Sequence, residues 1–178
     1  IVFQEMCLNN LPVTLVLDRA GIAGEDGPTH HGNFDISALR TFPNMTLMAP
    51  KDEKDLREML KLATRAEGPV AIRLPREKTP LLTDIPQNPV VIGKGEILRE
   101  GKDGAILGYG VTVARALEAA DMLAKEGVHV TVANARFAKP LDASLASKLI
   151  QSHPWVLTVE DHASQGGFGS AVLEELAL

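Results

Sequence analysis

The amino-acid sequence predicts an α/β protein with two tandem open sheets, mostly parallel, that carry helices on both faces. Short apolar segments alternate with amphipathic segments along the 178 residues. Strands separated by helices favour parallel sheets, because each connection must cross over the sheet before the next strand begins. The alternation stops once, in the proline-rich segment 79–89, and then restarts. The alternative arrangement is a single larger sheet.

Residues 1–78 are therefore expected to form one domain, 79–89 a linker and 90–178 a second domain. A helix is predicted from Asp52 to Ala66, because Asp52 can cap its first turn, where acidic residues also gather. Its apolar stripe is expected to consist of Leu56, Met59, Leu60 and Ala63. Apolar and β-branched residues predict the strands of this domain at Leu11–Leu17, Thr46–Ala49 and Val70–Leu74.

The second domain shows the same alternation of strands and helices. Its predicted strands are Ala105–Leu107, Val128–Ala133 and Val156–Val159. Its predicted helices are Val111–Glu126, Ala143–Gln151 and Gly169–Leu178. The chain is expected to stop inside this last helix, so that the second domain is truncated at its end.

Composition excludes several classes of partner. A net charge of −5, scattered basic residues and an aromatic content of 4% argue against nucleic acid and against an anionic membrane surface. No apolar run approaches the roughly 20 residues of a membrane span, and no secretory signal is visible, which favours the cytoplasm. Cys7 is the single cysteine, which excludes an intrachain disulfide and indicates a buried core residue.

The richest cluster of reactive residue types lies in the segment 18–32, which follows the first predicted strand. It holds Arg19, two carboxylates including Asp26, and the imidazoles of His30 and His31. Ligands of open α/β sheets bind beyond the carboxyl ends of the strands. Arginine forms bidentate bonds with phosphate, and histidine can transfer a proton near neutral pH. The alternative is a polar surface loop in which aspartate and arginine pair with each other.

Arg76 follows the strand predicted at Val70–Leu74. Because the carboxyl ends of parallel strands meet at one edge of a sheet, Arg76 and Arg19 could converge there and form an anion pocket. The alternative is an arginine in contact with solvent at the end of the domain.

Two weaker motifs follow strands of the second domain. Gly108-Tyr109-Gly110 resembles the start of a dinucleotide-binding loop, but Val113 breaks that pattern, so a tight turn is the preferred interpretation. Glu160-Asp161-His162 places carboxylates beside an imidazole, which could serve acid/base chemistry. A structural or interface role for this second motif is the preferred interpretation.

A series of motifs runs through almost the whole chain in a fixed order. They are Asp18-Arg19-Ala20-Gly21, Asp26-Gly27-Pro28-Thr29-His30-His31-Gly32, Phe34-Asp35, Met48-Ala49-Pro50-Lys51-Asp52-Glu53, Gly68-Pro69, Arg73-Leu74-Pro75-Arg76, Ile92-Gly93-Lys94-Gly95, Arg136-Phe137-Ala138-Lys139-Pro140-Leu141-Asp142 and Gly166-Gly167-Phe168-Gly169-Ser170. This series resembles the 1-deoxy-D-xylulose-5-phosphate synthase family of transketolase-like thiamine diphosphate enzymes. The first stretches are specific to that family, whereas the later ones also resemble transketolase-like enzymes in general.

The resemblance implies part of a transketolase pyrimidine-binding domain followed by a transketolase C-terminal domain. Enzymes of this family are transferases that condense pyruvate with D-glyceraldehyde 3-phosphate with loss of CO₂. The product feeds isoprenoid (non-mevalonate), thiamine and pyridoxal biosynthesis. The resemblance also implies thiamine diphosphate and Mg²⁺ as cofactors, a homodimer, and a cytoplasmic location, with a plastid left open.

The resemblance further implies roles for four residues. Arg19 and Arg76 match the residues that hold the phosphate of the acceptor. His30 matches the residue that contacts substrate hydroxyls and assists proton transfer, and Asp26 matches the carboxylate that orients the acceptor. No cofactor-binding or metal-binding residue is identified, because the family's cofactor glutamate and its Gly-Asp-Gly motif lie in parts of the enzyme before Ile1. The 178 residues alone are therefore expected to be inactive.

Two other functions are alternatives. One is the β-type subunit of a 2-oxoacid dehydrogenase, which shares this domain pair, although a phosphate clamp would serve no purpose for its substrates. The other is a non-catalytic binding module of two α/β domains.

Overall fold

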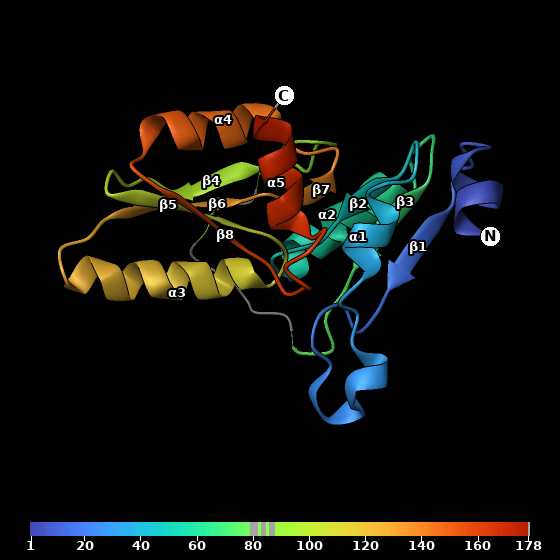
Figure 1. Cartoon of the computed structure of the whole chain (residues 1–178), viewed down its shortest axis with the longest axis horizontal. Coiled ribbons are helices and arrows are strands. Elements are labelled where there is room, and N and C mark those ends of the chain that lie inside the picture. The colour runs from blue at the N-terminus through green and yellow to red at the C-terminus, as the bar shows by residue number, and fades with distance from the viewer. Residues whose placement is uncertain (79–81, 83–84, 86–87, 178) are drawn as a thin grey trace.

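The computed structural model describes residues 1–78, 82, 85 and 88–177. They form two four-stranded sheets that lie side by side, the first built mainly from the first half of the chain and the second from the other half (Figure 1). Most of the segment predicted as a linker, 79–89, lies outside the described residues. None of the helices in the described part of the chain is both long enough and apolar enough to cross a membrane.

The first sheet has the strand order β1-β3-β2-β7 and the second the order β4-β6-β5-β8. The strands are β1 Thr14–Leu17, β2 Thr46–Met48, β3 Val70–Arg73, β4 Glu96–Arg99, β5 Gly104–Gly108, β6 Val130–Asn134, β7 Phe137–Lys139 and β8 Val156–Val159. The helices are the π-helix Val2–Cys7, the short 3₁₀ turns Gly24–Asp26 and Pro28–His30, and α1 Asp35–Leu39, α2 Glu53–Ala63, α3 Thr112–Lys125, α4 Ala143–Ser152 and α5 Phe168–Leu176.

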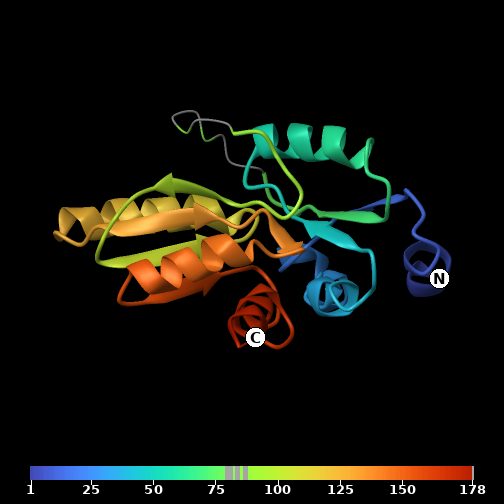
Figure 2. The same ribbon diagram turned by 90° about the horizontal axis from the view of Figure 1, so that it is seen from above.

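Helices cover both faces of each sheet, as predicted, because successive residues of the central strands point to opposite sides. In the second sheet, Ile106 packs towards α3, whereas Ala105 and Leu107 belong to the core on the side of α4 and α5 (Figure 1). In the first sheet, Ile72 packs towards α2 and Ala71 towards α1. Figure 2 shows these layers from above. Near-continuous apolar strands therefore follow from burial on both faces.

Every predicted strand and helix is present, with shifted ends at several of them. β1 begins at Thr14 rather than Leu11, because the amide of Leu11 bonds to Met6 and the carbonyl of Leu11 accepts from Val13, which makes a turn there. The capping prediction for α2 is confirmed, since the side chain of Asp52 accepts a hydrogen bond from the amide of Asp55.

The predicted apolar stripe of α2 wrongly included Leu60. Met59 and Ala63 are buried, but Leu60 is 42% exposed and lies on the solvent side of the helix. Cys7 is fully buried, as expected for a core residue, and burial raises the pKa of its thiol.

Two strands were not predicted, and both are antiparallel. β4 pairs with β6 at the edge of the second sheet. β7, which follows β6 in the chain, pairs with β2 and becomes the last strand of the first sheet. The prediction of two separate tandem units is therefore incomplete, because the second half of the chain supplies a strand to the first sheet.

A cluster of buried charged side chains also joins the two halves. This buried ion cluster consists of Lys51, Asp52, Asp55, Glu96 and Arg136. The ammonium of Lys51 lies 3.0 Å from Asp55 Oδ1 and 3.2 Å from Glu96 Oε1. The guanidinium of Arg136 lies 3.2 Å from Asp55 Oδ1 and 2.9 Å from Glu96 Oε1. Both carboxylates are thus shared between a cation of the first half and a cation of the second.

Candidate functional site

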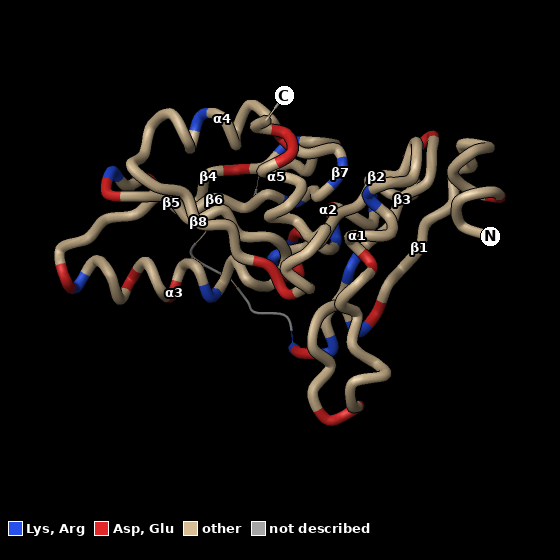
Figure 3. Tube along the Cα trace, viewed as in Figure 1, with Lys and Arg blue, Asp and Glu red and all other residues tan. Residues whose placement is uncertain are grey.

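The candidate site lies at the carboxyl ends of β1 and β3, which are adjacent parallel strands. Leu17, the last residue of β1, is in register with Arg73, the last residue of β3. The segment 18–32 leaves β1 as a long loop, here called the acceptor loop, and Arg76 follows β3. Charged residues of both signs gather at this end of the first sheet (Figure 3). The topology therefore brings Arg19 and Arg76 to one edge.

The two arginines converge on Asp26. Arg19 Nε lies 2.7 Å and Arg76 Nε 3.0 Å from the same oxygen, Asp26 Oδ2. A third contact joins Arg19 Nη1 to Asp18 Oδ2 at 2.6 Å. The structure thus contains both the predicted convergence of the arginines and the alternative pairing of aspartate with arginine.

The charges around Asp26 hold it in the ionised form. The hydrogen bond from Arg19 lowers the pKa of the Asp26 carboxyl, and the charges of Arg76, Arg19 and His30 add to this effect against a smaller opposing cost of desolvation. The same hydrogen bond raises the pKa of Arg19. These ion pairs persist at pH values above the ordinary aspartate range and are lost only as the pH falls through the lowered pKa.

The base of the acceptor loop is closed by backbone contacts with Gly32. The amide of Gly32 donates to the carbonyls of Arg19 at 3.0 Å and Gly21 at 2.9 Å, and the amide of Gly21 donates to the carbonyl of Gly32 at 3.0 Å. A Cβ atom on Gly32 would lie 2.6 Å from the carbonyl oxygen of Arg19. Glycine is therefore required at position 32 for the two ends of the loop to meet.

The adjacent histidines have different surroundings. His31 Nδ1 accepts a hydrogen bond of 3.1 Å from the amide of Ala23, so this ring holds the fold of the loop. His30 is exposed at the side of the loop, and its Nδ1 lies 3.2 Å from the hydroxyl of Thr29. Of the two imidazoles, His30 is therefore the more exposed.

The motif Glu160-Asp161-His162 has structural contacts, in agreement with the preferred interpretation. Glu160 accepts hydrogen bonds from the amides of Phe168 at 2.6 Å and Gly169 at 2.8 Å, and so caps the start of α5. The side chain of His162 is buried, with Nε2 at 3.6 Å from Asp35 Oδ1. Among the described residues, neither of these side chains forms a hydrogen bond or an ion pair with Arg19 or Arg76.

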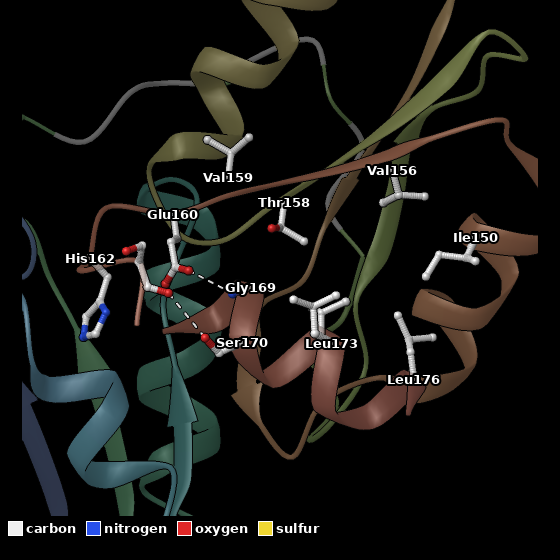
Figure 4. Close-up of a pocket in the computed structure, with 12 residues that line it drawn as sticks. Ile150, Val156, Thr158, Val159, Glu160, His162, Gly169, Ser170, Leu173 and Leu176 are labelled. Atoms are coloured by element: carbon white, nitrogen blue, oxygen red, sulfur yellow. Dashed lines mark hydrogen bonds between the residues drawn. The ribbon is translucent and has the colours of Figure 1, made fainter. Parts of the chain in front are cut away.

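A separate hollow lies between β8, α4 and α5. It has a volume of about 520 Å³ and is lined on one side by Ile150, Leu173 and Leu176, and on the other by Glu160 and Ser170 (Figure 4). Both oxygens of Glu160 already accept hydrogen bonds at its border. The arginine pair and Asp26 thus lie at the acceptor loop, outside this hollow.

Gly108-Tyr109-Gly110 forms a tight turn between β5 and α3. Gly110 has a φ of 68°, and the ring of Tyr109 is buried in a stack on Phe168, with 5.1 Å between ring centroids. The hydroxyl of Thr112 bonds to the backbone of Tyr109 and closes the turn.

Sequence reasoning missed the residues beneath the acceptor loop. The guanidinium of Arg73 is buried and forms a bidentate ion pair with Asp35, at 2.6 and 3.1 Å. Its Nη2 also donates to the carbonyls of Gly32 and Asp161. The only sequence signal was the position of Arg73 at a strand end, which an exposed arginine would share.

Histidine, cysteine, aspartate and glutamate are the side chains that could hold a metal ion in this chain. Among residues 1–78, 82, 85 and 88–177, no three histidine, cysteine, aspartate or glutamate side chains gather in a way that could hold a metal ion. The described side chains therefore do not form a metal site by themselves.

Comparison with protein families matches nearly the whole chain in two parts. Residues 1–80 match the pyrimidine binding domain of transketolase, and residues 93–178 match the transketolase C-terminal domain.

Curated relatives match along almost the entire chain. The chain is 54% identical to 1-deoxy-D-xylulose-5-phosphate synthase 1 of Geobacter sulfurreducens over 99% of its length, and 51% identical to the synthase of Thermomicrobium roseum, also over 99%. It spans 28% of the length of each of these relatives.

Solved structures share the fold. A split-gene transketolase described as an inactive β4 tetramer has a TM-score of 0.90 and 36% sequence identity, over 99% of this chain and 56% of that one. A transketolase mutant of Pichia stipitis, at 23% identity and a TM-score of 0.72, covers 90% of this chain and 25% of its own, and supports the fold alone.

Proposed function

We propose, because this chain belongs to the 1-deoxy-D-xylulose-5-phosphate synthase family of transketolase-like enzymes, that it carries the acceptor-recognition part of such a synthase. The complete enzyme would condense pyruvate with D-glyceraldehyde 3-phosphate and release CO₂. The observation that carries the proposal is the convergence of Arg19 and Arg76 on a single carboxylate oxygen of Asp26. Two guanidinium groups that both reach one carboxylate oxygen could also bond together to one phosphate group.

The phosphate of the acceptor would take the place of the Asp26 carboxylate between the two arginines. A phosphate monoester carries a charge of about −1.5 to −2 near neutral pH and has three acceptor oxygens, so it competes well with a single carboxylate. Asp26, released from one or both ion pairs, is then available to accept a hydrogen bond from a hydroxyl of the acceptor. An aspartate without such partners is still ionised near neutral pH, so Asp26 remains a hydrogen-bond acceptor after this release.

His30 lies on the same loop and presents its ring to solvent. We assign it the contact with the substrate hydroxyls and the assistance of proton transfer. His31 is assigned to loop structure, because its Nδ1 is used by the amide of Ala23. In this scheme the loop supplies a phosphate clamp, an orienting carboxylate and one proton-transfer group.

Thiamine diphosphate and Mg²⁺ are proposed as the cofactors of the complete enzyme, held mainly by parts of it other than these residues. Thiamine diphosphate chemistry belongs to the transketolase-like family as a whole. We propose a homodimer in the cytoplasm, with products used for isoprenoid, thiamine and pyridoxal biosynthesis. The 178 residues alone are expected to be inactive, and the description of the split-gene transketolase chain as an inactive tetramer supports that expectation.

The alternatives are less well supported. Relatives named as synthases, at 54% and 51% identity, favour this function over a 2-oxoacid dehydrogenase subunit. The arginine pair also argues against a dehydrogenase, because simple oxoacids carry no phosphate. A non-catalytic binding module would not require two arginines and Asp26 to meet at the carboxyl ends of β1 and β3.

Replacing Arg19 or Arg76 with alanine in the full-length enzyme is expected to raise KM for glyceraldehyde 3-phosphate far more than KM for pyruvate. A hydrogen bond between charged groups contributes about 1.5–3 kcal/mol, so each replacement should lower kcat/KM for the acceptor about 10- to 100-fold. Steady-state kinetics with each substrate varied in turn would measure the difference.

The matched control is Arg99→Ala, which removes a partly exposed arginine whose partner, Asp121, lies in the second half of the chain and outside the acceptor loop. Its kinetics should resemble the wild type. Equal effects of Arg19→Ala on both substrates would contradict the proposed phosphate clamp.

A further inference from the structure

We infer that Asp161 is a positioning residue for the acceptor site, because one short segment of the second half of the chain holds both ends of the acceptor loop. This inference rests on the proposed function and deepens it. Asp161 follows β8, on the sheet that does not carry the loop. Among the described residues it makes no hydrogen bond to Arg19, Asp26 or His30, so it acts on the site through the loop backbone.

The first end of the loop rests on the carboxylate of Asp161. The amide of Ile22 lies 3.3 Å from Oδ1 and 3.3 Å from Oδ2, so both oxygens share this donor. The carboxylate also lies directly against Gly21, where a Cβ atom would come within 2.0 Å of Oδ2. Gly21 has a φ of 79°. Position 21 is therefore shaped to let the Asp161 carboxylate approach the backbone.

The other end of the loop is tied to the same segment through Arg73. Arg73 Nη2 donates to the carbonyl of Asp161 at 3.2 Å and to the carbonyl of Gly32 at 3.4 Å. The ion pair with Asp35 fixes the guanidinium, which also lies over the Tyr109 ring, 5.8 Å from its centroid. Because Gly32 bonds to Arg19 and Gly21, the two anchored ends meet at the loop base.

The space beside this junction, lined in part by Arg73, Tyr109, Gly110 and Asp161, has a volume of about 20 Å³, enough for about one water molecule. Ile22 itself is exposed, so a water molecule could replace the Asp161 carboxylate as acceptor for its amide, but it would not tie the loop to the second half of the chain. Loss of the carboxylate should therefore let the start of the loop move, and Arg19, three residues before Ile22, would move with it.

The experiment compares Asp161→Ala and Asp161→Asn in the full-length enzyme. Alanine removes the acceptor for the Ile22 amide but keeps the backbone carbonyl that Arg73 uses. Asparagine keeps one acceptor oxygen in the same place. We expect Asp161→Ala to raise KM for glyceraldehyde 3-phosphate about tenfold, the effect of weakening one charge-assisted hydrogen bond, with KM for pyruvate unchanged. Asp161→Asn should recover most of the wild-type value.

The matched control is Asp103→Ala. Asp103 Oδ2 also accepts a backbone amide, from His129 at 2.7 Å, in a turn before β5 and away from the acceptor loop. This variant should leave both KM values unchanged. Hydrogen–deuterium exchange supplies a readout that does not depend on activity: peptides covering 18–32 should exchange faster in Asp161→Ala than in Asp103→Ala.

The outcomes separate the inference from the proposed function. If Arg19→Ala raises KM for the acceptor but Asp161→Ala changes neither this KM nor exchange in the loop, the positioning role is wrong. If Arg19→Ala has no selective effect on the acceptor, the proposed function fails, while faster loop exchange in Asp161→Ala would still establish the anchoring. Equal rises in both KM values with normal loop exchange would also overturn the positioning role.

Discussion

Replacing His30 with alanine in the full-length enzyme is expected to lower kcat with the phosphorylated acceptor by about 10²–10⁴-fold, the usual contribution of a positioned acid or base. His30 is exposed on the loop that carries Asp26 and Arg19. The hydroxyl of Thr29 lies beside Nδ1, so Nε2 is the ring nitrogen directed to solvent and substrate. Single-turnover measurements of product formation would isolate this step from substrate binding.

His31 provides the comparison within the same loop. His31→Asn keeps an acceptor near the position of Nδ1 for the amide of Ala23 and should therefore preserve the fold of the loop. Turnover in this variant is expected to fall much less than in His30→Ala. His30→Asn, which retains polarity but cannot accept a proton near neutral pH, should remain as impaired as His30→Ala. A larger loss of turnover in His31→Asn than in His30→Ala would show that the roles of the two histidines are reversed.

Replacing Arg136 with alanine is expected to destabilise the fold by about 3–5 kcal/mol, because it leaves buried carboxylates without their partner. The Arg136 side chain is 2% exposed and pairs with Asp55 and Glu96. It also donates to the carbonyls of Asn88 and Pro89. Urea unfolding, followed by circular dichroism, would measure the change in the free energy of unfolding.

The matched control for this prediction is Arg57→Ala. Arg57 also pairs with a carboxylate, that of Glu53, but its side chain is 70% exposed. Exposed pairs at this spacing on a helix contribute about 0.3–0.5 kcal/mol, so this variant should unfold almost like the wild type. If both variants lost a similar free energy of unfolding, burial would not be what makes the ion pairs of Arg136 more stabilising than that of Arg57.

The charges of the buried ion cluster do not balance among the side chains alone. Two cations, Lys51 and Arg136, face three carboxylates. Asp52 is the third carboxylate, and it accepts the Asp55 amide in the first turn of α2. The partial positive charge at the start of a helix favours an anion there, and it offsets the unpaired charge.

The sequence allowed the parallel strands and the long helices to be predicted because these elements have strong local signals. Strands buried on both faces are continuously apolar, as at Val70–Arg73, and α2 carries a capping aspartate with an acidic first turn. β4 carries Glu96 and Arg99 at its ends, and β7 has only three residues. Neither gives a local apolar pattern, so only the partner strands reveal them.

The candidate site could be predicted in part for the same reason. The convergence of Arg19 and Arg76 follows from parallel strand order, which the pattern of elements predicts. The support beneath the loop depends on contacts between distant parts of the chain. Arg73 pairs with Asp35, 38 residues away, and bonds to Asp161, 88 residues away. No local pattern distinguishes an arginine that turns inward from one that faces solvent.

The pairing of β7 with β2 has a consequence for the growing polypeptide on the ribosome. Roughly 90 residues separate β2 from β7 in the chain. At a translation rate of about 5–20 residues per second, they take roughly 5–20 s to synthesise. During that interval the backbone amides and carbonyls along one side of β2 have no partner strand, which makes them a template for wrong pairing with another nascent chain. Premature termination in this interval would release a product in which this side of β2 stays without its partner β7, so β2 gains its last neighbouring strand only after translation through Lys139.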